Sequence, residues 1–279
     1  MLGRCCRKVL VCDAGRPRNA VSRALHGFLS RDGINPMQLR HLAREELNRY
    51  PTVSFRESEI TDAVETADGF DVHLVDGVRL QAGYLVVATG VVDKLPEIDG
   101  IHELYGSNVF HCPYCDGWEV HGEPLAVYGD GTTGFEYALE LTGWSKNVIL
   151  CTDGGVLPSP VQLEQLGRNG ISIRPEPIQR LEREKDGMMI IWFRNGSGLM
   201  RRALFFNPQQ YQASPLAAKL GCTITEGGVV KVGKFQQTGS RLFVIGDAAR
   251  SVQLAIVAAA EGAEAAFAIN TSLQKESIC

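Results

Sequence analysis

The sequence predicts an α/β protein with parallel sheets, and three observations carry this prediction. Short, nearly continuous apolar runs alternate with helical patterns along the 279 residues, as is typical of parallel strands covered on both faces. Two hairpin signals interrupt the alternation. A plan of βα unit, hairpin and return strand therefore occurs twice, and a chain of this length accommodates two domains of ordinary size.

The individual elements follow from the positions of these patterns. The apolar runs predict buried strands within residues 8–13, 84–90, 124–131, 147–154 and 241–248. Amphipathic patterns predict helices within residues 35–50, 133–144 and 253–270. Asp76-Gly77 and Asn195-Gly196 predict the turns of hairpins within 70–90 and 188–206, because such dipeptides adopt the positive φ of tight hairpin turns. Each copy of the plan could bind a dinucleotide at the carboxyl ends of its strands.

The bulk properties argue against several classes of function. A net charge of −4 and a pI near 5.9 do not favour a nucleic-acid partner. No apolar run reaches the roughly 18 residues of a membrane span, and residues 1–6 lack the apolar core of a secretory signal. We therefore expect a cytoplasmic protein without a membrane segment. In that setting the eight cysteines do not indicate a disulfide framework.

A glycine-rich loop marks the second copy. Gly129, Gly131 and Gly134 follow a predicted strand and open a predicted helix, so their backbone could approach a pyrophosphate. Asp153 ends the next strand, 22 residues after Gly131, where an acid would accept from a ribose hydroxyl of NADH. No basic cluster follows for the extra phosphate of NADPH, and Asp130 would repel a phosphate. The alternative is a Rossmann-like unit that binds no nucleotide.

The first copy differs at its start. Residues 8–13 look like the second strand of such a unit, with Asp13 as the ribose acid. The first strand and its glycine-rich loop are expected before this point, whereas residues 2–7 look like the end of the first helix. Further along, Gly246-Asp247 follows a buried strand and precedes a helix rich in small residues. This favours a turn that holds the polar tail of a ligand, although an ordinary close-packed helix is an alternative.

The segment HCPYCDGW, residues 111–118, carries the chemistry. Cys112 and Cys115 have the spacing of a redox pair, in which one thiolate attacks and the other resolves the mixed disulfide. Asp116 could move the proton if burial raises its pKa. Zinc would need further ligands that the sequence does not supply, so we predict no metal site. The same two cysteines could also belong to a glutaredoxin-type motif or be inert thiols.

Four motifs in order resemble one known family over nearly the whole chain. They are ATG at 88–90, CPYCDG at 112–117, GDGTTG at 129–134 and FVIGDA at 243–248. This order resembles the thioredoxin-reductase-like, FAD-dependent pyridine nucleotide-disulfide oxidoreductases of low molecular weight. The resemblance implies two Rossmann-like (three-layer ββα) dinucleotide-binding domains, the second inserted in the first. It implies an N-terminally incomplete FAD domain at 1–107 plus 203–279, an NAD(P)-binding-like domain at 108–202, and a homodimer.

The resemblance also assigns roles to individual residues. It implies that Cys115 faces the flavin, that Cys112 exchanges with the substrate, and that Asp116 is the acid/base. For FAD it implies contacts from Asp13, Asn19, Thr89, Gly90, Gly246, Asp247 and Gln253. For the nicotinamide nucleotide it implies the glycine-rich loop at 129–134, together with Asp153. NAD(P)H is the candidate donor, and the missing basic cluster argues against NADPH specificity.

The function implied is an FAD-dependent disulfide reductase. Electrons would pass from NAD(P)H or another donor through the flavin and the Cys112–Cys115 pair to a thioredoxin-like protein or a small disulfide. One alternative is a dithiol oxidase, which runs the pair in the opposite direction with oxygen as acceptor. Another is a truncated, non-catalytic redox or binding protein.

Overall fold

The computed structural model describes residues 1–277 and divides the chain into two compact units. Unit 1 comprises Met1–Ala20, Gly27–Asp93 and the chain from Gln210 onward, and unit 2 comprises Val21–His26 and Lys94–Gln209. The domain boundaries expected from the sequence lie after residue 107 and before 203. Segment 94–107 groups with unit 2 because Ile101 and Leu104 lie in the core of that unit.

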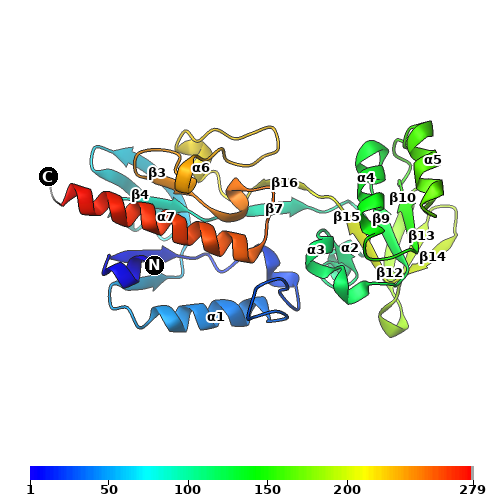
Figure 1. Ribbon diagram of the computed structural model, residues 1–279, viewed down its shortest axis with the longest axis horizontal. Coiled ribbons are helices and arrows are strands. Elements are labelled where there is room, and N and C mark those ends of the chain that lie inside the picture. The colour runs from blue at the N-terminus through cyan, green and yellow to red at the C-terminus, as the bar shows by residue number, and fades with distance from the viewer. Residues whose placement is uncertain (278–279) are drawn as a thin grey trace. The chain divides into compact units, whose positions relative to one another are not determined.

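Unit 2 is built around a five-stranded parallel sheet in the order β11-β10-β9-β15-β8. Its elements are α2 (Ile101–Leu104), β8 (Val109–Phe110), α3 (Pro113–Asp116), η3 (Trp118–Val120), β9 (Leu125–Tyr128), α4 (Gly131–Leu141), β10 (Val148–Cys151), α5 (Pro160–Arg168), β11 (Ser172–Arg174), β12 (Ile178–Arg183), η4 (Lys185–Gly187), β13 (Met189–Phe193), β14 (Gly198–Arg201) and β15 (Ala203–Phe206). Strands β12, β13 and β14 form a separate antiparallel sheet, and Figure 1 shows α4 and α5 beside β9 and β10.

Alternate side chains of the central strands in unit 2 point to opposite faces of the sheet. Leu125 and Val127 pack in one cluster with residues of α4 and α5. Ala126, between them, packs in another cluster with Met189 and Ile191 of β13. The sheet therefore lies between a helical layer and a β layer, which confirms the predicted three-layer arrangement. It also explains why these strands are apolar without alternation.

Unit 1 contains two parallel strand pairs, one antiparallel sheet and a long C-terminal helix. Its elements are η1 (Leu2–Cys5), β1 (Val9–Cys12), η2 (Arg18–Val21), α1 (Pro36–Leu47), β2 (Val53–Arg56), β3 (Ile60–Thr66), β4 (Gly69–Leu74), β5 (Arg79–Ala82), β6 (Leu85–Val87), β7 (Val91–Lys94), β16 (Gln209–Gln212), α6 (Leu216–Lys219), η5 (Lys234–Gln236), β17 (Leu242–Val244), η6 (Gly246–Ala249) and α7 (Ala255–Glu276). The parallel pairs are β1-β2 and β17-β6, and β3, β4 and β5 form the antiparallel sheet.

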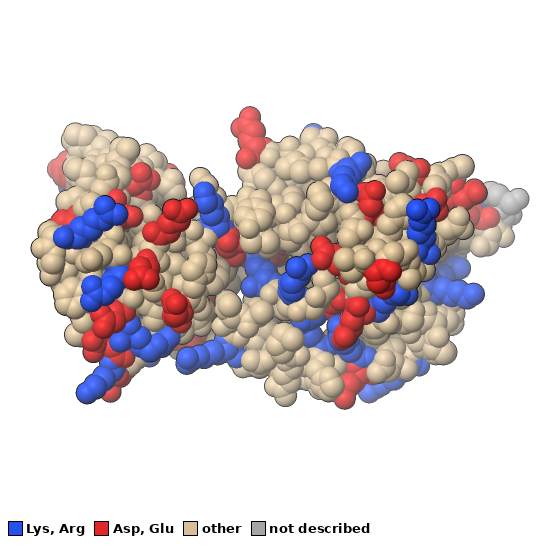
Figure 2. Space-filling view, turned by 180° about the vertical axis from the view of Figure 1, so that it is seen from behind, with Lys and Arg blue, Asp and Glu red and all other residues tan. Residues whose placement is uncertain are grey.

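The connecting strands and turns complete the fold. Strands β7 and β16, on which the chain passes between the units, pair with each other. Both predicted hairpins are confirmed, and the glycines of their turns, Gly77 and Gly196, have φ of 82° and 81°. Among the helices of residues 1–277, none combines the length and apolarity needed to cross a membrane. Acidic and basic side chains are interspersed on the face drawn in Figure 2.

Candidate active site

A disulfide joins Cys112 and Cys115 in unit 2, with 5.2 Å between their Cα atoms. Cys112 follows β8 in extended conformation, and Pro113 occupies the first position of α3, where its fixed φ and missing N–H suit a helix start. The backbone N–H groups of Cys115 and Asp116 both donate to the Cys112 carbonyl at 3.1 Å. This single helical turn brings two sulfurs three residues apart within bonding distance.

Exposed aromatic side chains flank the disulfide. Tyr114 and Trp118 are each 71% exposed. The ring of Tyr114 meets Trp144 edge-on at 5.2 Å, and Trp118 stacks on His121 at 4.5 Å. Two largely exposed aromatic rings therefore lie on the same short stretch of chain as the partly buried cysteines.

Asp116 ends the same turn in a partly buried position. Burial raises the pKa of this carboxyl to about 6, the Glu119 carboxylate acts in the same direction, and His26 opposes the shift. A carboxyl with this pKa exchanges its proton near neutral pH, as a general acid or base requires. The backbone places Asp116 directly after Cys115, next to the disulfide.

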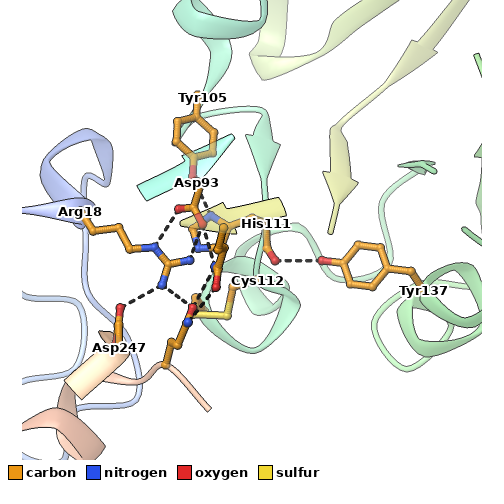
Figure 3. Close-up of a disulfide and its surroundings, with 10 residues drawn as sticks. Arg18, Asp93, Tyr105, His111, Cys112, Tyr137 and Asp247 are labelled. Atoms are coloured by element: carbon orange, nitrogen blue, oxygen red, sulfur yellow. Dashed lines mark hydrogen bonds and ion pairs between the residues drawn. A yellow bond between two sulfur atoms is a disulfide. The ribbon is translucent and has the colours of Figure 1, made fainter. Parts of the chain in front are cut away.

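Two tyrosines fix the backbone in front of Cys112. The Tyr105 hydroxyl lies 2.8 Å from Nδ1 of His111. The Tyr137 hydroxyl, from α4, donates to the carbonyl of the same histidine at 3.0 Å, as Figure 3 shows. Burial is the main cause that raises the pKa of Tyr137, so its hydroxyl stays a donor. Tyr105 thus holds His111 by its ring, and Tyr137 holds it by its backbone carbonyl.

Gly117 is required by packing and not by its φ of −70°. A Cβ on Gly117 would lie 2.4 Å from the Pro113 carbonyl oxygen and 2.7 Å from the Trp144 ring. We expect Gly117→Ala to lower the free energy of unfolding by about 1–3 kcal/mol through overpacking, measured by urea denaturation. Gly167→Ala is the matched control, because a Cβ there meets nothing within 4 Å. An equal effect of both replacements would contradict this explanation.

The glycine-rich loop of unit 2 connects β9 to α4. A Cβ on Gly134 would lie 2.6 Å from the backbone of Gly129, so the helix start packs directly on the end of the strand. Gly131 has φ of 51°. A cavity of about 500 Å³ lies beside this loop, lined by Lys94, Glu97, Tyr128, Asp130, Thr133, Tyr137 and residues 206–209, among others. The cavity thus lies at the loop where the sequence predicts a nucleotide.

The acids of this loop already have partners within unit 2. Asp130 accepts from the Val156 N–H at 3.3 Å, and the Gly131 N–H donates to the Val156 carbonyl at 2.6 Å. Asp153, with φ of 52°, accepts from the Ile178 N–H at 2.5 Å and from the Tyr128 hydroxyl at 3.4 Å. The glycine positions fit a nicotinamide nucleotide. The ribose acid is engaged, and the cavity lining offers a 2′-phosphate one cation, Lys94.

In unit 1 the two glycine turns meet because β6 and β17 are parallel neighbours. Val87 pairs with Val244, so the ATG turn, with Thr89 and Gly90, and the Gly246-Asp247 turn emerge at the same edge. Gly90 and Gly246 have φ of 69° and 70°. A Cβ on Gly90 would come 4.0 Å from the Asp247 Cβ. Two glycines at positive φ and one carboxylate thus lie at the same edge of the strand pair.

Arg18 connects two of the residues expected to contact FAD, Asp247 and Gln253. It donates to Asp247 at 2.9 Å and to Gln253 at 2.6 Å, and it binds both oxygens of Asp93 at 2.7 Å, as drawn in part in Figure 3. Burial lowers the pKa of Arg18, but the Asp93 and Asp247 carboxylates outweigh it and raise the pKa overall. Asn19 is the next residue in η2. Arg18 was not among the residues predicted from the sequence, although a PRN segment shortly after a strand was a possible signal.

Asp13 lies apart from this network, after β1. Its carboxylate accepts from the Gly15 N–H at 2.8 Å, from Arg44 at 2.9 Å and from Arg40. Burial acts to raise the pKa of Asp13, but the Gly15 N–H and the two guanidinium groups lower it overall. Asp13 therefore stays charged and is held by α1.

The groups of unit 1 fit FAD. The structure offers the backbone at Gly90 and Gly246 for close approach, the Asp247 carboxylate and the Gln253 amide as hydrogen-bonding groups, and Asp13 as a separate charged acceptor. These are the donors and acceptors that a ribityl chain, a flavin pyrimidine edge and a ribose need. Among residues 1–277, no group of three or more His, Cys, Asp or Glu side chains is placed to hold a metal ion.

Comparisons with known proteins agree with this geometry. The sequence profile described as "Pyridine nucleotide-disulphide oxidoreductase" matches residues 2–262. A "Probable thioredoxin reductase" of Arthroderma benhamiae is 27% identical over 281 residues, which cover 88% of this chain and 69% of that protein. The solved structure of a putative thioredoxin reductase TrxB from Bacillus anthracis has a TM-score of 0.92 at 28% identity, covering 99% of this chain and 93% of that one. An oxidoreductase from Agrobacterium tumefaciens has a TM-score of 0.91 at 33% identity, covering 98% and 92%.

Proposed function

The chain belongs to the pyridine nucleotide-disulphide oxidoreductase family, and from this premise we propose that it exchanges electrons with an external disulfide or dithiol through Cys112 and Cys115. The family is a group of oxidoreductases that act on disulfides and use FAD and NAD(P)H. The observation that carries the proposal is the Cys112–Cys115 disulfide with the partly buried Asp116 directly behind it. The exposed rings of Tyr114 and Trp118, close to the pair in sequence, support contact with an outside partner.

The pair performs the exchange in two steps. In the reducing direction the Cys112 thiolate attacks a substrate disulfide, and one substrate sulfur leaves with a proton from Asp116. The Cys115 thiolate then attacks the Cys112 sulfur, which reforms the disulfide and releases the second substrate thiol. Two electrons pass to the substrate. Bound FAD would supply the two electrons that restore the dithiol.

Residues of both units have assigned places in this proposal. Asp247, Gln253, Thr89, Gly90 and Gly246 would hold the flavin and its ribityl chain, with Asn19 beside them and Asp13 at the adenosine ribose. Gly129, Gly131 and Gly134 would hold a nicotinamide nucleotide. A thioredoxin-like protein or a small disulfide is the proposed partner, supported by the relatives' names. The homodimer and the cytoplasmic location also belong to the proposal.

A dithiol oxidase is the second candidate function, and the nucleotide loop favours it. Asp130 and Asp153 hold the backbone at Val156 and Ile178, so a nucleotide donor would compete with the unit's own hydrogen bonds. In this direction a substrate dithiol gives two electrons to the Cys112–Cys115 disulfide and becomes a disulfide, and Asp116 accepts one of its two protons. With FAD bound, the two electrons would then reduce oxygen, which takes up two protons and becomes hydrogen peroxide.

Flavin binding and donor assays test the proposal. We expect the purified chain to retain a flavin absorption band after incubation with FAD and desalting. NADH reducing the flavin at least as fast as NADPH would support the reductase. Flavin reduction by a small dithiol, with peroxide formed in air, would support the oxidase. A folded protein, by circular dichroism, that retains no flavin would contradict both and indicate a non-catalytic protein.

Asp247→Ala provides the specific variant for this test. We expect the Kd for FAD to rise about 10- to 100-fold, because a charged hydrogen-bond acceptor contributes about 1.5–3 kcal/mol. Asp68→Ala, at an exposed position, is the control and should leave the Kd unchanged.

A further inference from the structure

The segment Val21–His26 belongs to unit 2 although the chain on both sides of it belongs to unit 1. It packs tightly on the backbone of unit 2, since a Cβ on Gly106 would lie 2.6 Å from the Val21 carbonyl oxygen. Gly106, with φ of 78°, therefore allows a close approach that another residue would block. The start of the segment is therefore held against unit 2, and His26 lies at its other end.

His26 meets Glu119 in the turn that follows the disulfide. Its Nε2 lies 3.4 Å from Oε1 of Glu119, and the two side chains are 21% and 41% exposed. Glu119 lies in η3, which begins directly after Gly117. The segment thus places an ionisable base beside an acid that is three residues from Asp116.

The two partners act on Asp116 in opposite directions. Glu119 favours the protonated carboxyl, because a second negative charge disfavours ionisation, whereas His26 favours the carboxylate. Asp116 acts in turn on the Tyr137 phenol of α4. Three ionisable side chains, from the segment, from η3 and from α4, thus interact electrostatically with Asp116.

We propose that Glu119 and His26 are positioning residues that govern proton exchange at Asp116, with Glu119 favouring retention of the proton and His26 favouring its release. The inference rests on the proposed function, in which Asp116 serves the cysteine pair. If the pair only held the segment against η3, its loss would change the free energy of unfolding little, because exposed ion pairs contribute little to stability. Such a structural role would not shift the titration midpoint of Asp116 in opposite directions in the two variants.

The titration of Asp116 tests the inference without any cofactor. The carboxyl carbon resonance of Asp116 is followed by NMR against pH in protein labelled at aspartate, and Asp116→Asn identifies the resonance by its loss. His26→Gln removes the side chain that favours the Asp116 carboxylate and should raise the titration midpoint by about 0.5–1 pH unit. Glu119→Gln removes a negative charge and should lower the midpoint by a similar amount.

A second histidine–glutamate pair supplies the matched control. His41 and Glu45 lie 3.2 Å apart on α1, in unit 1, and are 71% and 58% exposed. His41→Gln and Glu45→Gln should leave the Asp116 midpoint unchanged. The inference is overturned if His26→Gln and Glu119→Gln shift the midpoint no more than these controls, or shift it in the same direction.

The pH dependence of turnover separates this inference from the proposed function. In the FAD-loaded protein, the inflection in the rate should follow the Asp116 midpoint upward in His26→Gln and downward in Glu119→Gln. If the NMR midpoints move as expected and the inflection does not, the role of the charge pair stands and the acid/base role of Asp116 fails. If the midpoints do not move, the charge pair itself is refuted.

Discussion

Replacing Cys115 with serine is expected to lower dithiol–disulfide turnover by at least about 1000-fold, because a single thiol cannot resolve a mixed disulfide. Cys112, at the start of α3, would still attack a substrate disulfide. The variant should therefore accumulate a covalent adduct with the substrate through Cys112. Initial rates with a small disulfide and the mass of the non-reduced protein measure both effects.

The companion variants make this result specific. Cys112→Ser should lose turnover and also fail to form the adduct. Cys5→Ser removes an exposed, unbonded cysteine and should keep the rate of the unmodified protein. Turnover by Cys115→Ser within tenfold of that rate would show that the disulfide is not the redox centre.

Glu261→Ala is expected to lower the free energy of unfolding by about 2–4 kcal/mol. Glu261 is 4% exposed on α7. Its carboxylate accepts from the Gly246 N–H at 2.7 Å and pairs with Arg250. Removing it leaves a backbone donor and a guanidinium without their acceptor, in the turn that also carries Asp247. Urea denaturation measures the loss.

Two further variants at α7 test the cause. Glu261→Gln keeps an acceptor for Gly246 but not the charge that faces Arg250, so an intermediate loss is expected. Glu264→Ala, at an exposed position three residues along the same helix, should change the free energy by less than about 0.5 kcal/mol. A similar loss at both positions would assign the effect to the helix and not to the Gly246 turn.

Much of the fold could be predicted because a strand that is buried on both faces shows as a continuous apolar run in its own sequence. Strands such as β9 and β10 are apolar at every position, since one set of side chains meets helices and the other meets β12 and β13. The hairpin turns could also be predicted from local sequence, because an Asp-Gly or Asn-Gly pair is enough to indicate a tight turn with glycine at positive φ. The pairing of Cys112 with Cys115 depends on a single helical turn of four residues that begins at a proline, so the local sequence was enough to indicate this pair.

The remaining site residues depend on contacts between distant parts of the chain. Arg18 and Asp247 are 229 residues apart in sequence, and no local pattern joins them. His26 likewise meets Glu119, and Glu261 meets Gly246 and Arg250, through contacts that no local pattern indicates. Asp153 shows the opposite case, since its position suggested a ribose contact. In the structure its carboxylate accepts from the Ile178 N–H, a contact that the sequence does not indicate because it depends on the packing of β12.

The pairing of β7 with β16 has a consequence for the history and engineering of the molecule. The chain leaves unit 1 on one strand and returns on its hydrogen-bonded neighbour, so the ends of segment 94–209 lie side by side. A segment whose two ends are adjacent can be inserted, deleted or exchanged in one genetic event, because the rest of the chain keeps its course. Residues 94–209 are therefore suited to transfer as one unit between related proteins, provided that the recipient has a segment equivalent to Val21–His26.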